Sequence, residues 1–347
     1  MLVRTAGYIL AEQRIVVIGA SAGGIEALTA IVKRLPRALP APFCVVLHLL
    51  AESPSILAHI LSREGNVPAK QVEDGERLCD GVIYVAAPDH HLLLERNGTA
   101  RSVRGPRENR HRPAIDPLFR SAAYVYGGGA IGIVLSGALD DGTAGLIAIK
   151  RLGGIAIVQD PHDAQHPSMP SSALAHVLVD HVLPAADIPS QIAAELSVPR
   201  KSIGTVDAVM KQETAMAKLD PHAMQEEERA GQPSAYSCPE CSGVLWQIRE
   251  GEFLRYRCRV GHAYSPESML AAQDEELEDA LWAAMKTLEE NAQLAGRLAA
   301  NERERGHEWM VKRFEEREKE ARQRAEVIRK FLLRDLGPVS EEQIGHR

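Results

Sequence analysis

The feature that most constrains the fold is a series of short apolar runs between residues 14 and 196, separated by segments with helical spacing. The runs lie at residues 15–18, 43–47, 82–85, 130–135 and 155–158. They are apolar on both faces, as expected of parallel strands that are covered by helices on both sides. Helical patterns follow at residues 24–35, 115–126 and 142–152. This alternation predicts an α/β fold with a doubly wound, mostly parallel, Rossmann-like sheet.

One segment of this region has a different pattern. Residues 92–103 contain the dipeptide Asn97-Gly98 at their centre. Asn-Gly is a strong hairpin signal, because both residues tolerate the positive φ of a tight turn. We therefore expect a small antiparallel hairpin here.

Composition excludes several classes of protein. The 347 residues suggest two domains, and 45% hydrophobic residues supply a sizeable core. The net charge of -7 and the pI of about 6.0 argue against a nucleic-acid-binding protein. No apolar run reaches the roughly 18–20 residues that span a bilayer, so no direct membrane insertion is expected. Residues 1–10 are too short and mixed for a secretory signal, and the five cysteines do not resemble a disulfide framework. These features predict a cytoplasmic protein with reduced thiols.

The pattern along the chain divides it into four parts. The α/β domain is assigned to residues 1–199, and the polar stretch 200–235 is interpreted as a linker. A small segment with cysteines, possessing little core of its own, occupies residues 236–265. Residues 266–347 are poor in Gly and Pro and predict one or two long helices. Their apolar residues at steps of three and four fit a short coiled coil or helical hairpin, and so predict self-association or binding of a signalling partner. These residues are Leu270, Leu277, Leu281, Ala284, Leu288, Ala295 and Leu298.

The turn Gly-Ala-Ser-Ala-Gly-Gly at residues 19–24 lies between the first predicted strand and its helix. This position exposes the Ser21 hydroxyl at the carboxyl edge of the sheet, beside free N–H groups at the helix start. The backbone N–H of Ala22 is our candidate donor to an oxyanion. A phosphate- or dinucleotide-binding turn is an equal alternative on this motif alone. However, the full G-x-G-x-x-G spacing is missing, and the second strand ends in His48 instead of an acidic residue.

Two further polar residues follow predicted strands. His48 ends the second run, and Asp141 follows the run 130–135. A serine nucleophile needs a base, and the base needs an acid that fixes its tautomer. Because strand ends meet at one edge of such a sheet, Ser21, His48 and Asp141 form a candidate catalytic triad. The alternatives are a structural histidine, an aspartate that only caps a helix, and Asp140 in place of Asp141. The chain order Ser–His–Asp differs from that of the α/β-hydrolases.

With these motifs the chain resembles the catalytic domain of the bacterial chemotaxis protein-glutamate methylesterases, the CheB family, from about residue 14 to 192. Besides the serine turn and His48, the resemblance rests on segments 72–76, 84–88, 111–113, 116–119, 141–145 and 169–170. It implies that Ser21, His48 and Asp141 hydrolyse methyl esters on receptor glutamates, without a metal or organic cofactor. It also implies deamidation of receptor glutamines, and methylated chemoreceptors as partners.

The chain also departs from the pattern of this family. Many members carry an amino-terminal receiver domain, but about 13 residues precede the first predicted strand here. We therefore do not expect regulation by aspartyl phosphorylation within this chain. Ala138 and Leu139 stand where many members have Met and Gly, which leaves a second oxyanion donor unassigned. The residues after 200 are not part of the usual methylesterase.

A second cluster of reactive residues lies in the segment 236–265. Cys238 and Cys241 form a Cys-x-x-Cys pair, and Cys258 and His262 form a Cys-x-x-x-His pair. Two such pairs supply the four ligands of a structural zinc site, which would stabilise a segment with little core. A metal-free hairpin with reduced cysteines is the alternative.

Three hypotheses on function follow. The first is the methylesterase. The second is a scaffold or signalling-interaction protein that retains this fold, and the third is an esterase or amidase for another protein. An intact Ser–His–Asp set favours an enzyme over a pure scaffold.

Overall fold

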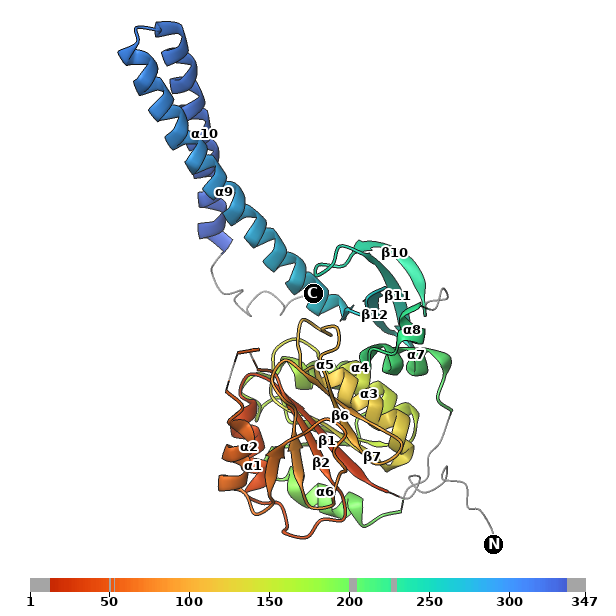
Figure 1. Cartoon of the computed structure of the whole chain (residues 1–347). Helices are drawn as coiled ribbons and strands as arrows, with labels where there is room; N and C mark the ends of the chain where they lie inside the picture. The colour runs from red at the N-terminus through yellow and green to blue at the C-terminus, as the bar shows by residue number, and fades with distance from the viewer. Residues whose placement is uncertain (1–12, 50, 53, 200–204, 226–229, 336–347) are drawn as a thin grey trace, which may run out of the picture. The chain divides into compact units, whose positions relative to one another are not determined.

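The computed structural model describes residues 13–49, 51–52, 54–199, 205–225 and 230–335. The chain forms two compact units, Met1–Met269 and Leu270–Arg347 (Figure 1). Residues 1–10, on which we expected no secretory signal, lie outside the described residues, as do parts of the predicted linker.

A seven-stranded sheet forms the centre of the first unit. Its strands are β1 (Ile15–Ala20), β2 (Phe43–Leu47), β3 (Ala69–Gln71), β4 (Ile83–Val85), β7 (Ala130–Val134), β8 (Ile155–Gln159) and β9 (His181–Leu183). They lie in the order β3-β4-β2-β1-β7-β8-β9, and every pairing is parallel. The predicted doubly wound sheet is thus confirmed. The edge strands β3 and β9 are only three residues long, too short to give a recognisable apolar run.

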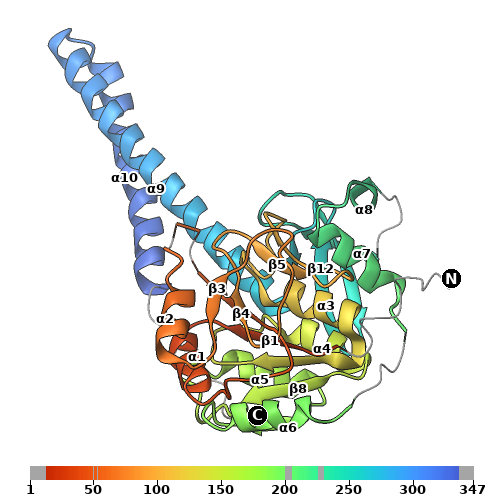
Figure 2. The same ribbon diagram turned by 60° about the horizontal axis from the view of Figure 1, so that its bottom comes forward.

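Helices cover both faces of this sheet, and alternate residues of β1 point to opposite faces. Ile15 and Val17 belong to one buried cluster, which also holds residues of α3 (Ile115–Tyr126), α4 (Thr143–Arg151) and α5 (Ser168–His176). Val16 and Ile18 belong to the other cluster. That second face carries α1 (Gly24–Val32), α2 (Leu57–Glu64) and α6 (Ile188–Leu196), as Figure 2 shows. Burial on both faces explains why these strands are continuously apolar.

The segment around Asn97-Gly98 forms the predicted hairpin. Strands β5 (His91–Leu94) and β6 (Ala100–Val103) pair antiparallel, and Gly98 has a φ of 79° in the turn. Leu92 and Leu94 of the hairpin are buried in the cluster on the α3 face. After α3, a short 3₁₀ turn, Gly127–Gly129, leads into β7.

The order of the strands determines where a site can form. From β1 the chain places β2, β4 and β3 on one side, and then returns to place β7 on the other side. The carboxyl ends of β1, β2 and β7 therefore meet at a topological switch point, where open α/β sheets bind their ligands.

The prediction that residues 200–235 are a linker is wrong for the part that the structure describes. Residues 200–235 include the helices α7 (Ala208–Ala217) and α8 (Pro221–Gln225), and Asp207 caps α7 by accepting from the Met210 N–H at 2.8 Å. Met210 is buried in the cluster on the α3 face. The buried face of α7 includes the polar residues Glu213 and Thr214, so its apolar residues alone give little periodic signal.

A second, antiparallel sheet follows, in the order β10-β11-β12-β13. Its strands are β10 (Gln232–Ser237), β11 (Val244–Glu250), β12 (Phe253–Cys258) and β13 (Ala263–Tyr264). This sheet belongs to the first compact unit, together with the α/β core.

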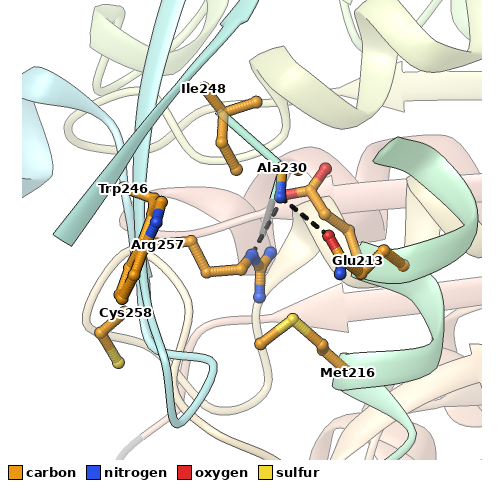
Figure 3. A pocket seen from close by; sticks show the side chains of 8 residues that line it. Glu213, Met216, Ala230, Trp246, Ile248, Arg257 and Cys258 are labelled. Atoms are coloured by element: carbon orange, nitrogen blue, oxygen red, sulfur yellow. Dashed lines mark hydrogen bonds and ion pairs between the residues drawn. The ribbon is translucent and has the colours of Figure 1, made fainter. Parts of the chain in front are cut away.

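A buried ion-pair network joins this sheet to the core. Arg257 of β12 contacts Glu108 of the core at 2.9 Å and Glu213 of α7 at 3.0 Å. Arg255 contacts Glu213 at 2.6 Å, and Arg120 of α3 contacts Glu108 at 2.7 Å. Figure 3 shows Glu213 and Arg257 directed toward one another. The cavity beside them measures only about 10 Å³, about the space of one water molecule, so the packing is close.

We expect the change Glu213→Gln to lower the free energy of unfolding by about 3–5 kcal/mol, because it leaves the three buried guanidinium groups of the network with only the carboxylates of Glu108 and Glu250. Denaturant unfolding of the full chain measures this effect. The control is Lys33→Gln, which removes an exposed ion pair with Glu64 and should cost about 1 kcal/mol or less. If both changes lowered the free energy of unfolding equally, the buried network would stabilise the protein no more than an exposed ion pair.

The second unit contains a helical hairpin, which is one of the two structures that the sequence predicted for this region. The helices α9 (Pro266–Glu304) and α10 (Glu308–Asp335) lie side by side (Figures 1 and 2). Ion pairs Arg303–Glu315 and Arg329–Glu289 show that they run antiparallel. Their contact uses small residues such as Ala292, Ala295 and Ala299, whereas Leu270 and Leu277 of the predicted apolar stripe are exposed. A coiled coil between chains stays a prediction.

Among the described helices, none combines the length and the hydropathy required to cross a bilayer.

Candidate active site at the carboxyl edge of the sheet

Ser21 occupies the turn between β1 and α1. Gly23 has a φ of 70°, in the left-handed region that favours glycine, and this residue turns the chain into the helix. The loop after β7 approaches Ser21 closely at Gly137. A Cβ on Gly137 would lie 2.8 Å from Ser21 Cβ and 2.0 Å from Met169 Sδ. The serine therefore lies in a tightly packed turn, with a position fixed by its neighbours.

His48 lies between Ser21 and Asp141. Its Nδ1 is 3.1 Å from Ser21 Oγ, and its Nε2 is 2.8 Å from Asp141 Oδ2. An ionised carboxylate only accepts hydrogen bonds, so Nε2 carries the proton and Nδ1 is free to accept one from the serine. The structure thus brings together the three residues that the sequence singled out, in one continuous hydrogen-bonded series.

Asp141 is held by donors on both oxygens. Oδ2 accepts from His48 and from the Ile115 N–H at 2.7 Å. Oδ1 accepts from Asn109 Nδ2 at 2.9 Å and from the N–H groups of Asp116 and Gly142 at 3.2 and 3.0 Å. Burial raises the pKa of Asp141, but the His48 interaction and these donors outweigh it and hold the pKa below its usual range. The carboxylate is therefore charged at neutral pH.

His111 covers the ring of His48. The two imidazoles stack with centroids 3.6 Å apart and an angle of 14° between the rings. Burial, followed by the charge of His48, lowers the pKa of His111 to about 3, so this ring is neutral. From the sequence alone, His111 in the His-Arg-Pro segment 111–113 is interpreted as a solvated loop histidine, with shaping of the substrate pocket as the alternative. In the structure it is a wall of the site that fixes the plane of His48.

Asn109 is a site residue that sequence reasoning missed. Its Nδ2 donates to Asp141 Oδ1 and to Asp116 Oδ2, both at 2.9 Å. Asp116 also accepts from the N–H groups of Gly142 and Gly145. Burial and then the charge of Asp141 raise the pKa of Asp116 well above its usual range. Asn109 thus bridges the two carboxyl groups, and no motif around it indicated this role.

Asp140, the alternative to Asp141, points to a different partner. Its Oδ1 accepts from Ser265 Oγ at 2.7 Å. Ser265 and Ser268 cap the start of α9 reciprocally: each hydroxyl accepts from the backbone N–H of the other, at 3.0 and 2.9 Å. Burial raises the pKa of Asp140 to about 7, as do the charges of Glu267 and Asp141, whereas the Ser265 hydrogen bond and His176 lower it.

The raised pKa of Asp140 predicts that the stability of the folded protein depends on pH. The folded protein holds the Asp140 proton more tightly than the unfolded chain, so its contribution to stability is lost as the pH rises from about 4 to about 7. Asp140→Asn keeps an acceptor oxygen for Ser265 and removes the charge. We expect the variant to gain stability over wild type near pH 8, by roughly 2 kcal/mol more than near pH 5. Thermal unfolding at both pH values measures this, and an equal difference at both would contradict a buried, titrating Asp140.

The candidate oxyanion donor lies directly after the serine. The carbonyl of Ala22 accepts from Ser136 Oγ at 2.8 Å, which fixes the next peptide unit, between Ala22 and Gly23. In the part of the chain that the structure describes, the Ala22 N–H has no acceptor. Leu139 adopts a φ of 61°, a left-handed conformation that costs a non-glycine residue about 1–2 kcal/mol.

The second cluster of reactive residues is also brought together. The donor atoms of Cys238, Cys241, Cys258 and His262 all lie within 4.8 Å of one another. Cys241 Sγ and Cys258 Sγ are 3.7 Å apart, and His262 Nδ1 lies 3.6 Å from Cys258 Sγ. Tetrahedral zinc with bonds of about 2.0–2.3 Å requires ligand separations of about 3.3–3.8 Å. The residues therefore fit the geometry of a structural zinc site.

Fold and site together define a doubly wound α/β protein with a Ser–His–Asp series at its switch point. The family model described as CheB methylesterase matches residues 16–192. A relative from Leptospira interrogans, named as a putative protein-glutamate methylesterase/protein-glutamine glutaminase, is 43% identical over 168 residues, which are 48% of this chain and 87% of the relative. A protein with the same two activities in its name, from Bradyrhizobium diazoefficiens, is 38% identical over 52% of this chain and 50% of its own length.

A solved structure agrees with these matches. The catalytic domain of the Thermotoga maritima CheB methylesterase superposes with a TM-score of 0.50 and 35% identity, over 52% of this chain and 98% of that domain. The chain belongs to the CheB methylesterase family. The matched part is the α/β core, so the second sheet and the helical hairpin lie outside the family model.

Proposed function

We propose that this protein is a protein-glutamate methylesterase that hydrolyses methyl esters on chemoreceptor glutamates and deamidates receptor glutamines. The observation that carries the proposal is the series Ser21–His48–Asp141 at the switch point of a CheB-type core. Family membership and the names of the relatives support the substrate class. No feature of the described residues favours a scaffold without activity.

The first half of the reaction forms an acyl-enzyme. Ser21 Oγ attacks the carbonyl carbon of the side-chain ester, while His48 Nδ1 accepts the serine proton. Asp141 stabilises the imidazolium through Nε2–H, and the Ala22 N–H donates to the developing oxyanion. The tetrahedral intermediate collapses, and His48 returns the proton to the leaving methoxy oxygen, which departs as methanol.

The second half restores the enzyme. Water loses a proton to His48 Nδ1 and attacks the acyl carbon, and Ser21 leaves with that proton to give a free glutamate. With a glutamine substrate the first leaving group is ammonia, and the second half is identical. No step requires a metal or organic cofactor near Ser21.

The partners follow from this function. The substrate proteins are the cytoplasmic domains of methylated chemoreceptors, so the expected location of the enzyme is the cytoplasm. The helical hairpin α9–α10 is proposed as a surface for a signalling partner or for self-association.

The test measures methanol released from chemoreceptor membranes that carry radiolabelled methyl esters. We expect the full-length protein to release methanol, and an organophosphonate that modifies Ser21 to stop the release in proportion to its labelling. Peptide mass spectrometry identifies the labelled serine. If the phosphonate labels Ser21 but the untreated enzyme releases no methanol, the protein is still a serine hydrolase. Methylated receptors are then not its substrate.

A further inference from the structure

The segment 236–265, which carries the cysteines and His262, directly contacts the loop around Asn109 that holds the triad residue Asp141. Strand β13 begins one residue after His262 and pairs with this loop: the Ala263 carbonyl accepts from the Asn109 N–H at 2.8 Å, and the Ala263 N–H donates to the Arg107 carbonyl at 3.2 Å. On the other side of His262, Gly261 packs against Pro106, where a Cβ would lie 2.8 Å from the proline ring. The turn between Cys258 and His262 therefore lies against the loop.

The same contact reaches the Asn109 side chain. Its Oδ1 accepts from the Ser265 N–H at 3.0 Å and from Ser268 Oγ at 3.1 Å, while its Nδ2 donates to Asp141 and Asp116. All four hydrogen-bonding positions are thus used, two by the serines and two by the carboxyl groups. Asn109 has a φ of 49°, so tertiary contacts hold its backbone in a conformation that is uncommon for non-glycine residues.

The surroundings of the four ligands also suit a metal. His262 turns Nδ1 toward the cysteines, and its Nε2 lies 3.4 Å from Glu240 Oε2. A carboxylate behind a ligating histidine fixes the ring and raises its basicity, as in many zinc sites. The Tyr264 hydroxyl lies 3.8 Å from Cys238 Sγ, within reach of a hydrogen bond to sulfur. A ligand set of three sulfurs and one imidazole favours zinc among the divalent metals.

We propose that Cys238, Cys241, Cys258 and His262 bind one zinc ion, and that the zinc-bound segment holds Asn109 against the triad residue Asp141. The metal is structural and does not touch the substrate. Asn109, Ser265 and Ser268 are positioning residues, because they act through Asp141 on His48. The positioning role rests on the proposed function of the triad, whereas zinc binding does not.

The metal is tested by elemental analysis of the full-length protein and its ligand variants. We expect one zinc per chain in the wild type and in the control Cys79→Ser, which changes an exposed cysteine outside the cluster. Cys241→Ala should lose the metal, and Cys241→His should retain it because imidazole also ligates zinc. A wild type without metal, or one that contains iron, would overturn the zinc assignment.

The positioning role is tested by the rate at which an organophosphonate labels Ser21, which needs no receptor. In Cys241→Ala, and in the double variant Ser265→Ala with Ser268→Ala, we expect the maximal labelling rate to fall about ten- to a hundredfold, as small misplacements of reacting groups do. The phosphonate concentration for half-maximal rate should stay unchanged. Cys241→His should label at the wild-type rate, and the double serine variant should still contain zinc.

These outcomes separate the parts of the proposal. A metal-free Cys241→Ala protein that labels at the wild-type rate would refute the link from zinc to triad. A double serine variant with unchanged labelling would refute it as well, even if the cysteine variant fails to fold. Wild-type protein that labels normally but releases no methanol from receptors would contradict the receptor substrate and leave this inference intact.

Discussion

Replacing Ser21 by alanine is expected to reduce methanol release from methylated receptors by about 10⁶-fold, the scale seen when a triad serine is removed from another serine hydrolase. The reason is that the variant lacks the hydroxyl whose oxygen lies 3.1 Å from His48 Nδ1 and attacks the ester. The measurement compares wild type and variant on the same membranes. Equal release from both would mean that Ser21 is not the nucleophile.

The variant should fold normally. Alanine fits the turn, because the close contact with Gly137 involves the Cβ that serine already has. Thermal unfolding of Ser21→Ala should therefore match that of the wild type. A variant that loses activity together with its stability would not identify the nucleophile, so both measurements belong to the test.

The second large effect is expected for Asp141→Asn, with a loss of about 10⁴-fold in kcat, as an aspartate-to-asparagine change in another triad gave. Five donors surround the carboxylate, three on Oδ1 and two on Oδ2. The asparagine side chain can be placed in two orientations, and in each of them its NH₂ group points at hydrogen-bond donors. At the Oδ2 position it repels the Nε2–H of His48, so the proton moves to Nδ1, which can then no longer accept from Ser21.

The control for this change is Asp187→Asn, which alters an aspartate before α6 whose side chain makes no capping hydrogen bond. It should leave kcat within about twofold, since surface changes away from such features have small effects. Full activity in Asp141→Asn would show that the aspartate is not needed to hold the His48 tautomer. It would favour a serine–histidine pair as the working unit.

Local patterns in the sequence were sufficient for the α/β core. Strands buried on both faces must be apolar throughout, so β1, β2, β4, β7 and β8 were visible as runs. The carboxyl ends of parallel strands share one edge, so strand positions alone predicted that Ser21, His48 and Asp141 lie together. The spacing of the cysteines and His262 likewise predicted that these four residues would meet.

Other parts depended on contacts between segments distant in sequence. Helix α7 lies in the stretch predicted as a linker. Its apolar pattern is weak, and its burial depends on the surfaces of α3 and β12, which are distant in the sequence. The ion pairs Glu108–Arg257 and Glu213–Arg255 join residues far apart in the chain, and charged residues are ordinarily placed at the surface.

The chemistry of the site shows the same division. The sequence by itself determined the apolar strand runs, the serine turn and the residues able to form a triad and a zinc site, because each depends on a local pattern of a few residues. Tertiary structure alone decided that Asp140 turns to Ser265, that His111 stacks on His48, and that Asn109 links Asp141 to Ser265. Side-chain direction at neighbouring positions is set by packing against distant segments, and a hydrogen bond across 156 residues leaves no trace in local spacing.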